Sequence, residues 1–511
     1  MMHRNFSSLA VALFLPQRFP REKGHLCAKP GAATGLAHDL TIQLRRVGRR
    51  ATMTAPGTYR APRTVLPLNF LLGLSALFAA LGAQIYPVLG IVSLAIIVCS
   101  LLQATKKNLA GPPFVMLIVF ALYVLPRAAM VILGLIDTFS GFNLGNDNQW
   151  IIGTVLFVYA FLLGIDLSGT NKVPLAAPAT GSKFAVMVGL FLICCSMLFF
   201  LSYLNSVGGV GGLIENYNAE TYFATVQDEV ASASKNGSIY TLIAGFTIIS
   251  AASFSIKKSP KLAFFYLILC GIALVMAIGF IKREYAFEVL MAIIVALVAK
   301  KSLVKLKKLA AISLGAAAGL FMLFLVRSGF QLDNLAEVPL LLLDTAEFWV
   351  LDQIINVYQN GVALTGYDYG WLHVMALVSP FVPYSSYMPL DHILIERSMG
   401  ITGWGIPPTI FGYAFLVFGW IGLIPYGIAL GFVIGRVDRW LKQRTQKAWF
   451  FLSAYMIFIM YCWFLFRNGD PALAGFSTNR FLLVVIFVAI IEHIFDRGVR
   501  KMDIQKRVRV A

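Results

Sequence analysis

A run of twenty residues without a charged side chain, Phe184-Ala-Val-Met-Val-Gly-Leu-Phe-Leu-Ile-Cys-Cys-Ser-Met-Leu-Phe-Phe-Leu-Ser-Tyr203, decides the fold class. The hydrocarbon core of a bilayer requires a helix of about 20 apolar residues. Of the 511 residues, 59% are hydrophobic and only 13% are charged, whereas about a quarter of a soluble domain is charged. The sequence therefore predicts an all-α, polytopic membrane protein in a lipid bilayer. It argues against a disordered chain, a disulfide-stapled secreted fold and a nucleic-acid-binding domain.

Twelve apolar runs are long enough to be spans, and the basic residues sort the loops between them. The formal charge of +18 is concentrated in the N-terminal tail, the C-terminal tail and alternate loops, for example at Lys106 and Lys107 or from Lys300 to Lys308. Such loops mark the cytoplasmic side. An even number of spans with both termini cytoplasmic places all of these groups on one side. The predicted spans are 65–82, 86–103, 113–135, 151–167, 184–203, 238–256, 262–281, 285–299, 309–326, 413–435, 448–466 and 480–495.

These spans divide the chain into five parts. Residues 1–64 form a basic cytoplasmic tail that resembles an over-extended gene start, since Met53 lies shortly before the first span. Nine spans occupy 65–326, with an external loop at 204–237. A large external loop, 327–412, is rich in acidic residues and partly helical or interfacial, with Trp371 to Tyr384 as an interfacial or re-entrant portion. Three spans follow in 413–495, and 496–511 is a second basic cytoplasmic tail.

The informative basic residues are those outside the tails and the cytoplasmic loops. A cation within the membrane or on the face that normally lacks cations is a functional-site hypothesis by default. Most of this set are arginines, whose guanidinium fork matches phosphate oxygens, so the cluster suits a lipid phosphate or pyrophosphate headgroup. The alternative is structural: Arg127 could pair with a carboxylate such as Glu288, and the others could extend to headgroups. The set comprises Arg127, Lys235, Lys282, Arg283, Arg327, Arg397, Arg467 and Arg480.

Two external histidines are candidates for a general base. An imidazole titrates near neutral pH, so either His373 or His392 could take up a proton. His392 has Asp391, Glu396 and Arg397 within six residues. The plainer interpretation of His392 is a solvated loop histidine.

Three short segments resemble one protein family. Gly405-Ile-Pro-Pro-Thr-Ile-Phe-Gly-Tyr-Ala-Phe-Leu-Val-Phe-Gly-Trp-Ile-Gly422 resembles the stretch with which that family re-enters the membrane after its large loop, Ile281-Lys-Arg-Glu-Tyr285 resembles its basic span end, and Phe466-Arg-Asn-Gly-Asp-Pro471 resembles its late external Arg-Gly. The family is the bacterial oligosaccharide repeat-unit polymerases of O-antigen and exopolysaccharide synthesis, the Wzy type. The architecture agrees across roughly residues 65–495. Many members carry Glu where Tyr413 stands, so we assign Tyr413 no catalytic role.

The resemblance implies a GT-C-like glycosyltransferase of the bacterial inner membrane. It would transfer a glycan from undecaprenyl pyrophosphate to the next lipid-linked repeat unit on the periplasmic side, and a chain-length regulator is a further partner left open. Lys282, Arg283, Arg327, Arg467 and Arg480 would bind pyrophosphate, while His392, Glu396 and Arg397 would carry the catalysis. Tyr367, Tyr369, Trp371 and Tyr384 would stack on sugar rings. No cofactor is implied, and no metal is expected, because the loop between the first two spans contains no acid that could hold Mg²⁺ or Mn²⁺.

Two alternatives stay open from the sequence. The related O-antigen ligase shares twelve spans, a large periplasmic loop and arginine-based handling of pyrophosphate. A lipid-linked oligosaccharide flippase or secondary transporter is also commonly twelve-spanning. Against a transporter, we find no repeat between the two halves of the chain, and an external loop of some 85 residues is not required for alternating access.

Overall fold

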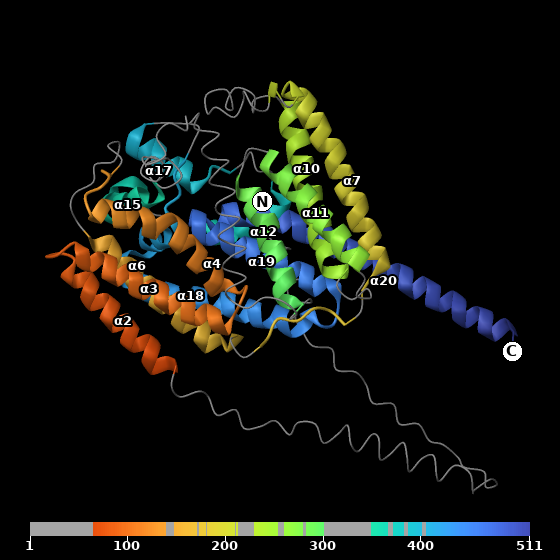
Figure 1. The fold of residues 1–511 in the computed structure, drawn as a ribbon, viewed down its shortest axis with the longest axis horizontal. Helices are drawn as coiled ribbons and strands as arrows, with labels where there is room; N and C mark the ends of the chain where they lie inside the picture. Colours follow the sequence, from red (N-terminus) through yellow and green to blue (C-terminus); the bar gives the residue numbers. More distant parts are fainter. Residues whose placement is uncertain are drawn as a thin grey trace, which may run out of the picture. The chain divides into compact units, whose positions relative to one another are not determined.

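The computed structural model describes residues 65–510, with gaps at 139–147, 171–172, 180, 210, 213–228, 254–259, 280–282, 301–348, 366–370, 383–386 and 401–404. The chain divides into two compact units, 1–63 and 64–511, and all described residues belong to the second. The elements of this unit are helical throughout the described ranges (Figure 1). Seven of the helices described are long and apolar enough to cross a membrane. The prediction of a polytopic helical membrane protein is therefore confirmed.

Every predicted apolar run coincides with a helix except the ninth, 309–326, which lies outside the described residues. The helices of the first part are α2 (Val65–Gly82), α3 (Val88–Lys107), α4 (Pro112–Val119), the π-helix η1 (Phe120–Val124), α5 (Leu125–Ile132), α6 (Gln149–Ser168), α7 (Lys183–Ser206), α10 (Glu229–Ala252), α11 (Pro260–Gly279) and α12 (Arg283–Ala299). Those of the second part are α15 (Val350–Thr365), α16 (Trp371–Val378), the 3₁₀-helix η5 (Ser379–Phe381), α17 (Leu390–Met399), α18 (Thr409–Thr445), α19 (Trp449–Asn468) and α20 (Pro471–Val510).

Hydrogen bonds between distant loops sort the helix ends into two groups. At one end, which we call the basic end, Ala177 N–H donates to Ala299 O, Ala179 N–H donates to Gln446 O, and Ser182 donates to Glu492. At the other end, which we call the distal end, the Asn148 amide of α6 donates to Ala83 O just after α2. These contacts place the ends of α12 and α18 and the start of α7 at the basic end, and the start of α6 and the end of α2 at the distal end.

Helices α6 and α18 form the tightest contact of the bundle, and glycines allow it. A Cβ on Gly164 of α6 would meet the backbone of Ile428 and Phe432, and a Cβ on Gly431 of α18 would meet the backbone of Phe161. Small residues that let helix backbones approach are the usual basis of helix packing in membranes. Helix α2 and the distal segments pack against this pair of helices.

Several helices begin earlier than the sequence predicts, most clearly α10, which starts at Glu229 and not at 238, together with α18 and α20. The tenth span was expected at 413–435, but α18 starts at Thr409 and is interrupted at Gly419, whose φ of 57° and ψ of −164° are not helical. The last span was expected at 480–495, but α20 starts at Pro471. Proline suits the first position of a helix, where its missing N–H has no partner to lose. The polar residues before Arg480 therefore belong to the helix and not to a loop.

A proline also explains the π-helix in the third span. Pro126 lacks an N–H and its ring crowds the carbonyl four residues earlier, so a regular α-helix cannot continue through it. The turn Phe120–Val124 widens to a π-helix just before it, and α5 resumes at Leu125. Such single π turns are frequent at functional sites.

Candidate functional site

The turn between α19 and α20, residues Arg467 to Asp470, forms the centre of the candidate site. Gly469 has a φ of 68° and ends α19 in the left-handed conformation, which glycine adopts without steric cost. A Cβ on Gly469 would also collide with the carbonyl of Thr409 at the start of α18. Glycine is therefore required at this position for two reasons, the left-handed turn and the close approach of α18.

Asp470 fixes three elements around this turn. Its carboxylate accepts a hydrogen bond from Leu473 N–H at 3.0 Å and so caps α20. It also accepts from the Tyr387 hydroxyl and, at 3.0 Å, from Leu390 N–H at the start of α17. Burial raises the pKa of the Asp470 carboxyl, although these hydrogen bonds act in the opposite direction. Asp470 thus joins the beginnings of α17 and α20 to the end of α19.

Arg467 lies in the last turn of α19 and is half-buried. Its guanidinium donates to the Asn468 side chain at 2.7 Å and lies 5.3 Å from the centre of the Tyr123 ring. The contact with Tyr123 places the guanidinium below the end of α5. Tyr123 is nine residues before the end of α5, which corresponds to about 14 Å of helix.

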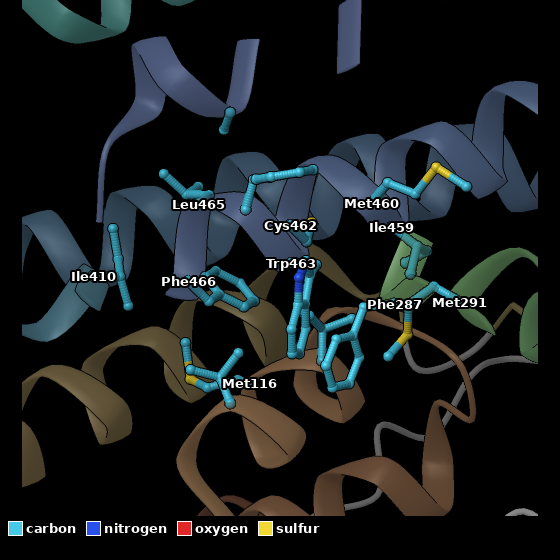
Figure 2. Packing of buried hydrophobic residues seen from close by; sticks show 14 of the residues in the cluster. Met116, Phe287, Met291, Ile410, Ile459, Met460, Cys462, Trp463, Leu465 and Phe466 are labelled. Atoms are coloured by element: carbon cyan, nitrogen blue, oxygen red, sulfur yellow. The ribbon is translucent and has the colours of Figure 1, made fainter. Parts of the chain in front are cut away.

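A stacked aromatic pair brings α12 beside α19 below this turn. The rings of Phe287 and Trp463 are 4.5 Å apart and nearly parallel, and Figure 2 shows them side by side. Arg283 begins α12, four residues before Phe287, and Arg467 lies four residues after Trp463. Because the two helices run in opposite directions and residues four apart share a face, both arginine positions lie one turn beyond the pair toward the distal end.

Arg127 has a carboxylate partner inside the fold. Its guanidinium forms a bidentate ion pair with Asp352 of α15, with Nε to Oδ1 at 3.1 Å and Nη2 to Oδ2 at 2.6 Å. Both side chains are fully buried. The structural alternative for Arg127, a pair with a carboxylate, thus holds, and Asp352 of the predicted large loop supplies that carboxylate. Through it, α15 is held against the spans.

Arg480 lies within the span and not beside Arg467. It is nine residues into α20, about 14 Å of helix from Pro471. Its guanidinium donates to the Tyr240 hydroxyl of α10 at 2.9 Å and lies 5.4 Å from the centre of that ring. The structure therefore does not bring Arg480 and Arg467 together into one cluster.

The three predicted catalytic residues all lie on α17. His392 is half-buried, whereas Glu396 and Arg397 are exposed. His392 and Glu396 are four residues apart and share a face of the helix, but Arg397 is rotated by about 140° from His392. A Cβ on Gly405 would lie 2.7 Å from the backbone nitrogen of His392. The segment that resembles the family's re-entry motif therefore begins directly against α17.

The structure describes only some of the remaining predicted site residues. Trp371 begins α16 and is 57% exposed. Lys235 is buried in α10, 5.8 Å from the centre of the Tyr203 ring. The structure places Arg283 at the first position of α12 and does not describe its side chain. Lys282, Arg327, Tyr367, Tyr369 and Tyr384 lie outside the described residues.

Sequence reasoning missed an aromatic and histidine cluster next to the site. His373 Nε2 and the Tyr426 hydroxyl are 3.1 Å apart, and the His373 ring packs edge-on against Tyr413, which is fully buried. The sequence offered His373 as a candidate base and Trp371 to Tyr384 as an interfacial or re-entrant portion, but it did not indicate that His373 contacts Tyr413 and Tyr426. Asp470 was missed as well, although the Asp-Pro pair is typical of a helix start.

No group of three or more His, Cys, Asp or Glu side chains among the described residues is arranged to hold a metal ion. The chemistry available at the described distal turn is that of a guanidinium, an amide, phenols and a capped carboxylate. A guanidinium at a recessed position suits an anion such as phosphate.

Comparison with known proteins yields one match. A family model described as "Putative O-antigen polymerase" matches residues 108–469, over two thirds of the chain. The match runs from the loop before α4 to the glycine that ends α19, so it includes Arg283 and Arg467. No curated protein and no solved structure matches.

Proposed function

The chain belongs to the O-antigen polymerase family, and from that membership we propose that it joins oligosaccharide repeat units carried on undecaprenyl pyrophosphate. Membership supports a glycosyltransferase-like polymerising enzyme with a lipid-linked substrate. The proposal adds the carrier, the inner membrane with both termini cytoplasmic, the periplasmic face as the place of reaction, and the residues that act.

In the proposed reaction, the acceptor hydroxyl attacks the anomeric carbon of the growing glycan. The bond between that carbon and the phosphate oxygen breaks, and undecaprenyl pyrophosphate leaves with the bonding electrons. The hydroxyl proton passes to a base. Negative charge develops on the leaving oxygen, and cations held in place beforehand stabilise it most effectively.

The observation that carries the proposal is the Phe287 and Trp463 stack. It sets the positions of Arg283 and Arg467 one turn beyond the same contact, on two helices that meet only in the folded chain. We propose that these two arginines hold the pyrophosphate. Arg480, inside the span on α20, is proposed as a separate contact to the same anionic substrate and not as part of that pair.

The base is proposed to come from α17. His392 and Glu396 share one face of this helix, and Asp470 fixes the start of the helix beside Arg467. Arg397 is proposed to contact the glycan or phosphate from the neighbouring face, and Trp371 to stack on a sugar ring. We also propose that the reaction needs no metal, since residues 83–87 between α2 and α3 contain no acid. A chelator should leave the rate unchanged.

The test is polymerisation by the purified protein in nanodiscs, supplied with synthetic lipid-linked repeat units and read as a ladder on a gel. Arg467→Ala should reduce the rate by roughly 10²–10³-fold, the usual loss when a donor to a developing charge is removed. Arg467→Lys should recover only part, because lysine lacks the fork. The matched control is Arg444→Ala, which removes an arginine stacked on Trp440, 4.3 Å from the ring centre, at the basic end.

Full activity of Arg467→Ala would refute the pyrophosphate assignment. In cells lacking the gene, single repeat units on the carrier are the expected result. Long chains accumulating on the carrier would instead indicate the ligase, and repeat units retained on the cytoplasmic side would indicate a flippase.

A further inference from the structure

An apolar cavity of about 620 Å³ lies between α2, α6 and α18. Its walls follow α6 from Val155 to Asp166, eleven residues or about 16 Å of helix. The cavity is therefore elongated along the direction in which a lipid chain would lie. No residue of the proposed polymerisation site lines it.

The chemistry of the walls excludes a polar occupant. Its polar side chains are already engaged in hydrogen bonds: the Asn69 amide donates to Asp166 at 3.3 Å, and the Tyr159 hydroxyl bonds Ser100 at 2.7 Å. All other wall residues are apolar or glycine. A water-filled cavity needs two to four polar partners for each water, so this one suits hydrocarbon.

The cavity opens sideways and closes at one end. Phe70, Leu74 and Ile424 are 65%, 37% and 44% exposed, so the rim faces the surroundings of the bundle. Asn69 and Asp166 lie near the basic end of their helices, and their hydrogen bond closes the cavity there. A chain would therefore enter from the side or from the distal end.

The inner wall connects the cavity to the distal segments. Ile424 and Ile428 of α18 both line it, and Tyr426 lies between them in the same turn. The Tyr426 hydroxyl bonds His373 of α16, and its ring lies 6.2 Å from that of Phe157 of α6. A chain in the cavity would thus end close to the part of the molecule where α16 folds back onto the spans.

We infer that this cavity binds the isoprenoid tail of a lipid-linked oligosaccharide. The inference rests on the proposed function, in which each transfer brings together two lipid-linked molecules and therefore two tails. An elongated, laterally open and largely apolar cavity, bounded at the basic end by the Asn69 and Asp166 pair, fits one of these tails with its headgroup at the distal end.

Substitution of a rim residue tests the inference with little risk to folding. Leu74→Trp narrows the opening, and Leu71→Trp, three residues away on α2 at 58% exposure and outside the cavity lining, is the matched control. For a donor with an undecaprenyl tail, Leu74→Trp should raise KM roughly ten-fold, the effect of about two methylene groups losing their contacts. KM for a donor with a ten-carbon tail should not change, nor should kcat for either donor.

A second measurement does not depend on activity. A diazirine-bearing undecaprenyl phosphate should label peptides of α2 or α6 in wild type and label them several-fold less in Leu74→Trp. Equal labelling by a diazirine phospholipid, an equal rise in KM with Leu71→Trp, or an equal effect on both donors would overturn the inference. Wild type that makes no polymer would refute the proposed function, while the labelling would still decide whether the tail binds in the cavity.

Discussion

Two buried aspartates, at opposite ends of the bundle, show that its ends treat charge differently. At the basic end, Asp438 of α18 accepts hydrogen bonds from Lys442 at 2.8 Å, Asn108 at 3.2 Å, Tyr455 at 2.8 Å and Thr170. Lys442 is 2% exposed and Asp438 is fully buried. Cation and anion therefore neutralise each other inside the fold.

On the distal side, Arg127 pairs with Asp352 much as Lys442 pairs with Asp438, so the contrast between the two ends concerns Asp470, Arg467 and Arg480. The Asp470 carboxylate accepts hydrogen bonds from a phenol and from backbone N–H groups, whereas Arg467 donates to Asn468 beside the Tyr123 ring, and Arg480, farther into the span, donates to Tyr240. A cation oriented by neutral groups retains more of its field for an external anion. The comparison teaches that the basic end buries a paired charge for folding, whereas the distal side combines such a pair with guanidinium groups held beside aromatic rings.

The largest expected effect is on folding at the basic end. Asp438→Ala leaves Lys442 buried without its carboxylate, which should cost about 3–5 kcal/mol of stability. Thermal unfolding of the detergent-solubilised protein, followed by fluorescence-detected gel filtration, measures this. The double variant Asp438→Asn with Lys442→Met should regain much of the loss, because it removes both charges. If Asp438→Ala unfolds like wild type, the cluster does not stabilise the fold.

Substitution of Arg480 tests the distal side of the comparison. Arg480→Ala should lower the polymerisation rate by roughly 10- to 100-fold, the range for losing a hydrogen bond to a charged group, with little change in thermal stability. Tyr240→Phe, which removes only the hydroxyl that orients the guanidinium, should have a smaller effect in the same assay. A loss of stability without a loss of rate would make Arg480 a structural residue like Lys442.

Removal of the Asp470 carboxylate should have a modest effect on stability. Asp470→Ala deletes the cap of α20, which is worth about 1 kcal/mol, and leaves the Tyr387 hydroxyl and Leu390 N–H without this acceptor, which adds about 1–3 kcal/mol. Asp470→Asn keeps a side-chain oxygen at the cap and should lose less. Unfolding midpoints of the two variants, measured side by side, check the order, and an equal loss in both would show that the cap is not what Asp470 contributes.

The smallest effect concerns pH. Since the pKa of the Asp470 carboxyl is raised by burial, the folded protein keeps this proton to higher pH than the unfolded chain does. The resulting stability is complete below the unfolded pKa of about 3.9 and is lost as the pH rises through the folded value. The wild-type midpoint should fall across that window relative to Asp470→Asn, which does not titrate. Parallel curves for the two proteins would contradict this assignment.

The spans and their alternation could be predicted from the sequence, because hydropathy and the placement of Lys and Arg are local properties. The residues with which buried charged side chains pair inside the bundle could not be predicted from the sequence. Arg127 was recognised as a buried cation that needs a carboxylate, but Asp352 is 225 residues away, and nothing in the sequence separates it from Glu288. The pair of Lys442 with Asp438 is local, since a spacing of four residues is typical of a helix pair, but its burial with Asn108 and Tyr455 depends on the fold.

The candidate site was predicted in part. Arg467 and Arg283 stand out in the sequence as cations on the external face, where cations are rare. That both lie one turn beyond the Phe287 and Trp463 stack could not be predicted, because only the fold creates this stack. The start of α20 was misplaced because Pro471 and the small polar residues after it resemble a loop. Their small side chains instead allow close packing, since a Cβ on Gly475 would approach Ala376 O of α16 to 2.7 Å.

The π-helix at Phe120–Val124 makes the third span sensitive to its length. Each residue turns a helix by about 100°, and a π turn holds about one residue more than an α turn. Arg127, which follows this turn, reaches Asp352 only in that altered phase. The gain or loss of a single codon here would rotate Arg127 away from α15, so this stretch should diverge between species by substitution and keep a constant number of residues.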